Sequence, residues 1–179
     1  PLLPDTVVRI TGDCPLIDPV LVDRLIEFFQ SQDVDYVSNT APATFPDGLD
    51  VEVFRFSVLE RAALEATLSR EREHVTPYIR ESGHFVTANY ANPEDWSAER
   101  WTVDEPEDFD VICSVFENFH PRVDFGWEEV LDLSRHRSDL FDGNRHLRRN
   151  AGAEQGTGQK LWNRAKRVIP GGNMLLSKR

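Results

Sequence analysis

The stretch from Val7 to Pro19 constrains the fold of this chain more than any other. It reads Val-Val-Arg-Ile-Thr-Gly-Asp-Cys-Pro-Leu-Ile-Asp-Pro, a β-rich apolar run that ends at a Gly-Asp pair and a proline-broken turn. Asp18 followed by Pro19 is typical of a helix N-cap with proline at the first helical position. In an open α/β sheet, a carboxylate that meets a metal ion or a phosphate stands at the carboxyl end of a strand, as Asp13 does. The stretch therefore predicts a strand, a turn with a candidate functional acid, and a helix.

The same order of strand, acid, proline and helix occurs a second time. Residues 100–103 read as a short strand that ends at Asp104, and Pro106 begins a run with apolar residues at helical spacing. Because the carboxyl ends of parallel strands meet at one edge of a sheet, we expect Asp13 and Asp104 to lie at the same edge.

Hydrophobic periodicity predicts further alternating strands and helices along the chain. Further strands are expected at 35–39, 49–56 and 85–90, helices at 19–30, 57–68 and 74–80, a charged turn at 69–73 and a peripheral helix at 127–133. The order is mostly β then α, with one hairpin-like insertion. It predicts a three-layer α/β domain with a mostly parallel sheet.

Charge is distributed unevenly along the 179 residues, whose formal net charge is −11 at pH 7. From residue 135 onward there are eleven Lys or Arg and three Asp or Glu, which leaves nine basic and 28 acidic residues before it. An acidic domain repels a polyanion, which excludes nucleic acid as a partner unless the basic tail alone binds it. The three lysines, Lys160, Lys166 and Lys178, all lie in the tail. In the front part, arginine or a metal ion must therefore serve wherever a phosphate is bound.

Composition argues against several other classes of protein. No apolar run is long enough to cross a bilayer, and the first residues have neither the basic flank nor the length of a signal peptide. We therefore expect a cytoplasmic protein with no membrane partner. Cys14 and Cys113 are too few and too widely separated for a disulfide framework or a cysteine-based zinc site, so both are predicted to be small core residues.

Four motifs occur in an order that is similar to one enzyme family. They are Arg9 to Pro19, Pro46 to Glu52 (Pro-Asp-Gly-Leu-Asp-Val-Glu), Arg72 to Ile79 (Arg-Glu-His-Val-Thr-Pro-Tyr-Ile) and Arg100 to Phe109 (Arg-Trp-Thr-Val-Asp-Glu-Pro-Glu-Asp-Phe). Together they resemble the cytidylyltransferases of the spore coat polysaccharide biosynthesis protein F type, which are similar to CMP-Kdo synthetases. The resemblance runs from Val7 to about Phe119 and implies a Rossmann-like nucleotidyltransferase fold.

This resemblance implies a reaction and a metal site. In the family a sugar hydroxyl attacks the α-phosphate of CTP, pyrophosphate leaves, and the CMP-activated sugar serves cell-surface polysaccharide synthesis. Aspartates at two strand ends carry Mg²⁺, and Asp13 and Asp104 match them. Mg²⁺ takes few carboxylates and completes its shell with water and phosphate oxygens. The alternatives are an N-cap or turn residue for Asp13 and a helix cap for Asp104.

The resemblance also indicates residues that contact the sugar. Asp47, Gly48 and Asp50 resemble a sugar-facing loop, in which the glycine permits close approach and the acids accept hydrogen bonds. A plain turn is the alternative. Glu73 and His74 form an adjacent acid-base pair, and His74 can donate to a sugar carboxylate or a phosphate. A helix-start glutamate and a surface histidine are the alternative for this pair.

Two arginines and one further acid complete the candidates. Arg72 and Arg100 are candidates to hold anions in a part of the chain without lysine, although solvated arginines are common. Asp108 lies one helical turn after Asp104 and is assigned to the helix dipole rather than to the metal. No residue is assigned as a catalytic acid or base.

The domain boundaries follow from composition and from the resemblance. The family begins with a strand and a loop that grips the triphosphate, which do not precede Pro1, so residues 1–142 are expected to be the C-terminal part of a nucleotidyltransferase domain, inactive alone. Residues 143–158 lack periodicity and predict a linker. Residues 159–179 resemble the first helix and turn of a class III, PLP-dependent aminotransferase related to glutamate-1-semialdehyde aminomutase. A fusion is implied, with its PLP lysine after Arg179.

Two other functions stay open at this point. A metal-dependent glycosyltransferase of similar architecture normally shows an Asp-x-Asp pair, from which Asp13-Cys14-Pro15 departs. A non-catalytic interaction module would leave Asp13 and Asp104 far apart or paired with arginine. The sequence identifies neither the sugar nor the oligomeric state.

Overall fold

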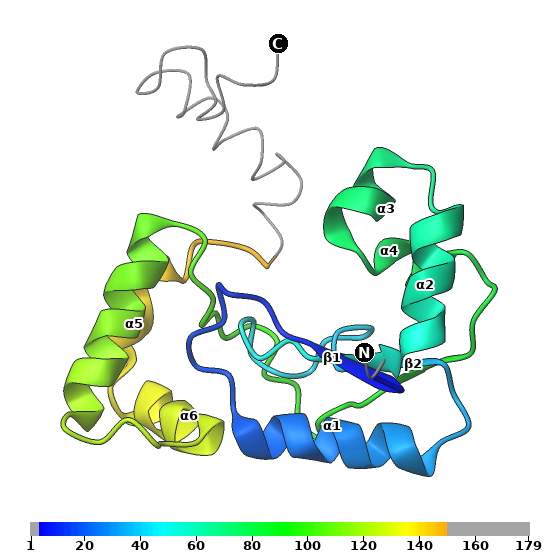
Figure 1. The fold of residues 1–179 in the computed structure, drawn as a ribbon. Helices are drawn as coiled ribbons and strands as arrows, with labels where there is room; N and C mark the ends of the chain where they lie inside the picture. The colour runs from blue at the N-terminus through cyan, green and yellow to red at the C-terminus, as the bar shows by residue number, and fades with distance from the viewer. Residues whose placement is uncertain (1–3, 150–179) are drawn as a thin grey trace, which may run out of the picture. The chain divides into compact units, whose positions relative to one another are not determined.

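Both strands and helices occur along residues 4–149, the part of the chain that a computed structural model describes (Figure 1). The strands are β1 (Thr6–Arg9), β2 (Tyr36–Ser38), β3 (Glu52–Arg55) and β4 (Thr87–Asn89). The helices are α1 (Pro19–Ser31), α2 (Phe56–Glu65), α3 (Ser69–His74), α4 (Pro77–Glu81), α5 (Pro106–Phe119), α6 (Trp127–His136) and the short 3-10 helix η1 (Ser138–Asn144). The α/β class predicted from the sequence is confirmed.

The described strands form one mixed sheet in the order β1-β3-β2-β4. β3 pairs antiparallel with both β1 and β2, and β2 pairs parallel with β4. Three strands therefore run in one direction and β3 runs against them. The carboxyl ends of β1, β2 and β4 meet at the edge of the sheet where β3 begins. In an α/β sheet this is the edge at which ligands bind.

Helices cover both faces of the sheet, which gives the three layers that were predicted (Figure 1). On one face, α1 buries a stripe of three side chains against the middle of β2 and β3: Leu21, Leu25 and Phe29. On the other face, Tyr36 and Phe54 stack on each other and pack against α2 and α4. Fully burying one large apolar side chain contributes roughly 1.5–3 kcal/mol, so each layer is held mainly by such contacts.

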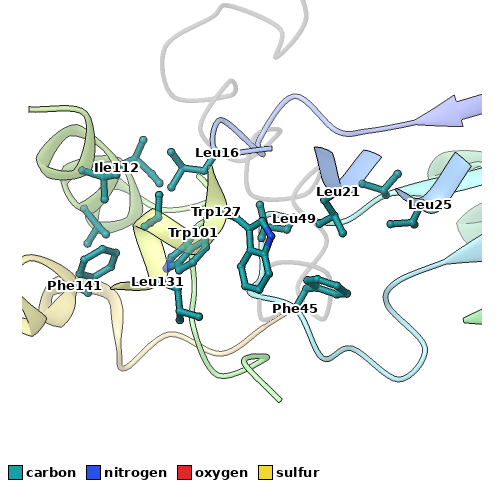
Figure 2. Close-up of a cluster of buried hydrophobic side chains, with 14 of the residues drawn as sticks. Leu16, Leu21, Leu25, Phe45, Leu49, Trp101, Ile112, Trp127, Leu131 and Phe141 are labelled. Atoms are coloured by element: carbon teal, nitrogen blue, oxygen red, sulfur yellow. The ribbon is translucent and has the colours of Figure 1, made fainter. Parts of the chain in front are cut away.

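The hydrophobic core continues from the α1 layer to the second half of the chain. Figure 2 shows Trp101, Trp127 and Phe141 in this cluster, together with Leu16 and Leu49. The helix predicted at 127–133 is therefore not peripheral, because α6 buries three of its side chains in the core: Trp127, Val130 and Leu131.

Three local predictions differ from the structure. The charged turn expected at 69–73 is helix α3. Residues 100–103 do not form a strand. Within residues 4–149, their one β-bridge is the parallel pairing of Arg100 with Asp47. Helix η1 has no counterpart in the sequence prediction, since a single 3-10 segment is too short to show periodicity.

Most of the residues in the predicted linker and aminotransferase-like segment lie outside the described part of the chain. Asn144, which was placed in the linker, is buried at the end of η1. The remaining linker residues from 150 and the aminotransferase-like stretch at 159–179 lie outside the described residues. Within residues 4–149, no helix is long and apolar enough to span a membrane.

Candidate functional site

Asp13 lies in the turn that leaves β1 and leads to α1. The amide of Cys14 donates to the carbonyl oxygen of Thr11 at 3.3 Å and so closes the turn. Asp18 then caps α1, as predicted, by accepting two backbone amides through Oδ1. Its other oxygen accepts the amide of Trp127 at 2.8 Å, which ties the start of α6 to the same turn.

The segment before Asp104 lies directly against the Asp13 turn. The amide of Val103 donates to the carbonyl oxygen of Asp13 at 2.8 Å. The hydroxyl of Thr102 donates to the same oxygen at 3.1 Å. Asp104 is the next residue along the chain, so the two aspartates expected to carry Mg²⁺ are on adjoining backbone segments. A metal ion shared by their carboxylates stays a prediction.

Gly48 brings a third segment against residues 101 and 102. Its φ is +102°, and a Cβ there would stand 2.6 Å from the carbonyl carbon of Trp101 and 2.7 Å from the amide nitrogen of Thr102. Only glycine permits this approach, and the group that approaches is the backbone of this chain. Asp47 adds two backbone hydrogen bonds, to Glu99 at 2.9 Å and from Trp101 at 2.7 Å.

Arg100 is the centre of a buried ion-pair cluster. Its guanidinium contacts three carboxylates: Asp108 at 2.7 Å, Asp47 at 3.1 Å and Asp104 at 3.2 Å. Only 6% of its side chain is exposed. These internal partners argue against the predicted role of Arg100 as a binder of substrate anions. The guanidinium joins the Gly48 segment to the start of α5 instead.

Asp108 has no exposed side-chain surface and closes the first turn of α5. Its oxygens accept from Arg100, from the amides of Asp104 and Glu105, and from the Asn144 side chain at 2.9 Å. Burial alone would raise the pKa of Asp108, but these hydrogen bonds outweigh it and lower the pKa below its usual value. Asp108 is therefore structural, which agrees with leaving it out of the metal site.

The contacts and exposure of Asp104 bear on whether this side chain can bind Mg²⁺. The Asp104 side chain is 27% exposed, and Arg100 contacts its Oδ2. This ion pair is one arrangement expected of a non-catalytic module, so it does not by itself favour a metal. Asp104 is nevertheless one of three carboxylates around a single guanidinium. Two aspartates on adjoining segments fit a hard cation that takes few carboxylates.

Asp50 also acts on the turn that carries Asp13 and Cys14. Burial, followed by the negative charges of Asp13 and Asp50, raises the pKa of Cys14 to about 12. The thiol is therefore neutral and faces Asp13, with Sγ 3.6 Å from Oδ1. A neutral thiol is a poor ligand for Mg²⁺, which agrees with the predicted core role of Cys14. Asp50 is close enough for its charge to act on this thiol, so it lies near the Asp13 turn.

The remaining predicted residues lie on helix α3. Glu73 and His74 are exposed at its C-terminal end. Arg72 donates to the carbonyl oxygens of Ala63 and Ala66 at 3.2 and 3.3 Å and so fastens α3 to the end of α2. A structural role explains Arg72 without a substrate. Within residues 4–149, no group of three or more His, Cys, Asp or Glu side chains is arranged to hold a metal ion.

Sequence reasoning missed two polar side chains that organise this region. Glu52 is buried at the start of β3, where it accepts from Tyr36 and Thr76 and pairs with Arg9. The available signal was a glutamate within the apolar run Val51-Glu52-Val53-Phe54. Asn144 gave no signal, because its partners, Asp108 and the carbonyl oxygen of Arg100, are far away in sequence.

Comparison with known proteins finds a similar structure and similar sequences. No family model matches the chain. A solved cytidylyltransferase from Leptospira borgpetersenii serovar Hardjo-bovis superposes with a TM-score of 0.72 and 31% identity, over 76% of this chain and 58% of that one. The chain has a cytidylyltransferase-like fold.

Two curated proteins are similar in sequence to this chain. One is an uncharacterized protein of Methanocaldococcus jannaschii, 31% identical over 150 residues, which are 82% of this chain and 60% of that protein. The other is the spore coat polysaccharide biosynthesis protein SpsF of Bacillus subtilis, 30% identical over 142 residues, which are 76% of this chain and 57% of SpsF. The chain thus spans about three fifths of the length of these relatives. The chain is thus similar to part of SpsF and to part of a solved cytidylyltransferase.

Proposed function

We propose that the protein carrying this chain transfers CMP from CTP to a sugar for cell-surface polysaccharide synthesis, with Mg²⁺ held by Asp13 and Asp104. The observation that carries the proposal is the hydrogen bond from the Val103 amide to the carbonyl oxygen of Asp13, at 2.8 Å. It holds the two acid-bearing segments together at the carboxyl edge of the sheet. The likeness to SpsF and to a solved cytidylyltransferase supports the reaction class.

The acids divide into two roles in this proposal. Asp13 and Asp104 would hold Mg²⁺, which supplies charge neutralisation at the α-phosphate and the leaving pyrophosphate. Arg100 and Asp108 fix the backbone around Asp104, because a guanidinium with several carboxylates holds each of them in a set orientation. Orientation matters because positioned groups supply much of the rate of such a transfer.

The sugar contacts we propose are Asp50, Glu73 and His74. Asp50 lies near the Asp13 turn, and Glu73 and His74 are exposed on α3. An aspartate or glutamate accepts hydrogen bonds from sugar hydroxyls, and a histidine can donate to a sugar carboxylate. We leave Asp47, Gly48, Arg72 and Arg100 out of this set, since each has a structural role within the chain.

The proposal is tested by measuring pyrophosphate release with a panel of nucleoside triphosphates and sugar acceptors. We expect release that needs Mg²⁺, CTP and an acceptor together, and a much lower rate with ATP, GTP or UTP. Hydrolysis of UDP-sugars without any reaction of CTP would indicate the glycosyltransferase alternative. Failure of the protein to react with or bind any nucleotide would indicate the non-catalytic one.

A further inference from the structure

Glu52 is a buried carboxylate that joins three strands to a helix. It is 6% exposed, yet it has a partner on each neighbouring element. Oε2 pairs with Arg9 of β1, and Oε1 accepts from the hydroxyl of Tyr36 in β2. The same Oε1 accepts from Thr76 Oγ1 at 2.7 Å, just before α4. A buried charge is tolerated only when it is paired and hydrogen-bonded. These contacts therefore hold the Glu52 side chain in one position.

Next to Thr76 the backbone adopts a conformation that is unusual for its residue. Val75 has φ 69° and ψ −54°. The amide of Thr76 donates to the carbonyl oxygen of His74 at 2.8 Å, which closes a γ-turn centred on Val75. β-branched residues avoid positive φ, and this form of γ-turn is rare and strained. Such a turn persists only where its surroundings hold it.

Different groups hold the residues before and after this turn. After the turn, Thr76 is bound to Glu52, and buried Pro77 begins α4. Before the turn, Arg72 fastens α3 to the end of α2. The residues between these anchors are Glu73, His74 and Val75. The turn therefore sets where Glu73 and His74 lie relative to the start of β3.

We propose that Glu52 is a positioning residue that holds the strained turn at Val75 and thereby fixes Glu73 and His74 for contact with the sugar. This rests on the proposed function, which assigns the sugar contact to these two residues. Glu52 itself is not a catalytic residue, because both of its oxygens are bound by groups of the chain. It acts at the carboxyl edge of the sheet, since its β1 partner, Arg9, is the last residue of that strand.

The test uses Thr76→Val, which removes the hydroxyl bound to Glu52 and keeps the β-branched shape. NMR signals of the His74 ring report the position of the turn. The rate of hydrogen exchange with solvent at the Arg80 amide reports the opening of α4, because this amide donates to the carbonyl oxygen of Thr76 at 3.1 Å. We expect the His74 signals to shift and the exchange to become about tenfold faster, as for loss of one hydrogen bond to a charged group.

Two further variants separate positioning from general packing. Adding Val75→Gly to Thr76→Val should restore the His74 signals, because glycine adopts positive φ without strain. Thr76→Ser keeps the hydroxyl and should leave the signals unchanged. The matched control is Thr44→Val, which removes a hydroxyl that accepts the Asn92 amide at 2.7 Å and should change neither readout.

Unchanged His74 signals in Thr76→Val, or a shift that Val75→Gly does not restore, would overturn the proposal. The sugar contact has a separate readout. Where positioning holds, Thr76→Val in the whole protein that carries this chain should raise KM for the acceptor severalfold, with a smaller change in kcat. If the NMR results hold and KM is unchanged, Glu52 positions the turn but the assigned sugar contact of His74 is wrong. The two failures are therefore distinguishable.

Discussion

The amide of Val103 donates to the carbonyl oxygen of Asp13 at 2.8 Å, and this bond joins two turns that are far apart in the sequence. Because the contact is between backbone atoms, a substitution of either aspartate side chain leaves it in place. The two candidate metal ligands can therefore be changed without separating the segments that carry them.

Gly48→Ala is expected to destabilise the protein severely. A Cβ at this position would stand 2.6 Å from backbone atoms of Trp101, and φ is +102°. We expect a loss of about 3 kcal/mol or more in the free energy of unfolding, measured by denaturant titration. Gly83→Ala is the control, because φ is +74° there but no atom lies within 4 Å of the added Cβ. It should lose only about 1–2 kcal/mol, and equal losses in the two variants would contradict this account.

Asp108→Asn is expected to destabilise the protein by about 3 kcal/mol at pH 7, because it removes one partner of a buried ion pair. The loss stays at the low end for such pairs because Asp47 and Asp104 still contact Arg100. Asp110→Asn, on the exposed side of α5, is the control and should change stability by less than about 0.5 kcal/mol. A near-neutral Asp108→Asn would show that the Arg100 cluster is not a framework element.

The depressed pKa of Asp108 also predicts a pH dependence. Its hydrogen bonds hold the pKa below the usual value, so between the two pKa values the unfolded chain binds more protons than the folded one. The stabilisation by Asp108 is thus fully present above about pH 4 and is lost as the pH falls through the lowered pKa. The free energy of unfolding, measured from pH 7 to pH 2, should fall less steeply in acid for Asp108→Asn than for the unsubstituted chain. If the free energy of unfolding falls equally with pH in both proteins, other carboxylates cause the loss of stability in acid.

Asn144→Ala is expected to cost about 1–2 kcal/mol of stability. Its amide donates to the carbonyl oxygen of Arg100 at 3.0 Å and to Asp108 at 2.9 Å, both buried. Asp142→Ala, two residues earlier and exposed, is the control and should be almost neutral, because its pair with Arg145 lies at the surface. If the two variants unfold at the same denaturant concentration, Asn144 does not belong to the packed part of the chain.

Periodicity predicted the elements that are long or strongly patterned. α1 and α5 begin at the prolines from which they were predicted to begin, because an acid followed by proline is a local signal for a helix start. Residues 100–103 were predicted as a strand and form only one bridge, because the amide of Val103 bonds to Asp13 rather than to a neighbouring strand. That choice depends on a tertiary contact, which no local pattern records.

The candidate site was predictable in its acids but not in their partners. Asp13 and Asp104 were predicted as site residues from their places after two short apolar runs. The structure puts their backbone segments side by side. Arg100 was assigned to anions of a substrate, and the structure gives it three carboxylates of the chain itself. Asp47 is remote from Arg100 in sequence, so the pairing appears only after folding. The spacing of residues in the sequence therefore indicates where acids gather. Which arginine pairs with which acid can be seen only in the folded structure.

The most direct test of the central claim uses the whole protein that carries this chain. It measures CTP-dependent pyrophosphate release and the thermal midpoint for Asp13→Asn and Asp104→Asn, with Asp110→Asn as control. Each amide keeps the size of the side chain but removes the charge that holds Mg²⁺. Losing one such electrostatic contact typically costs about 3 kcal/mol or more of barrier, on the order of a hundredfold in rate. We predict this loss in both site variants with little change in the midpoint, and normal release in the control. Near-normal turnover in either site variant, or lost turnover with a collapsed midpoint, would contradict the account.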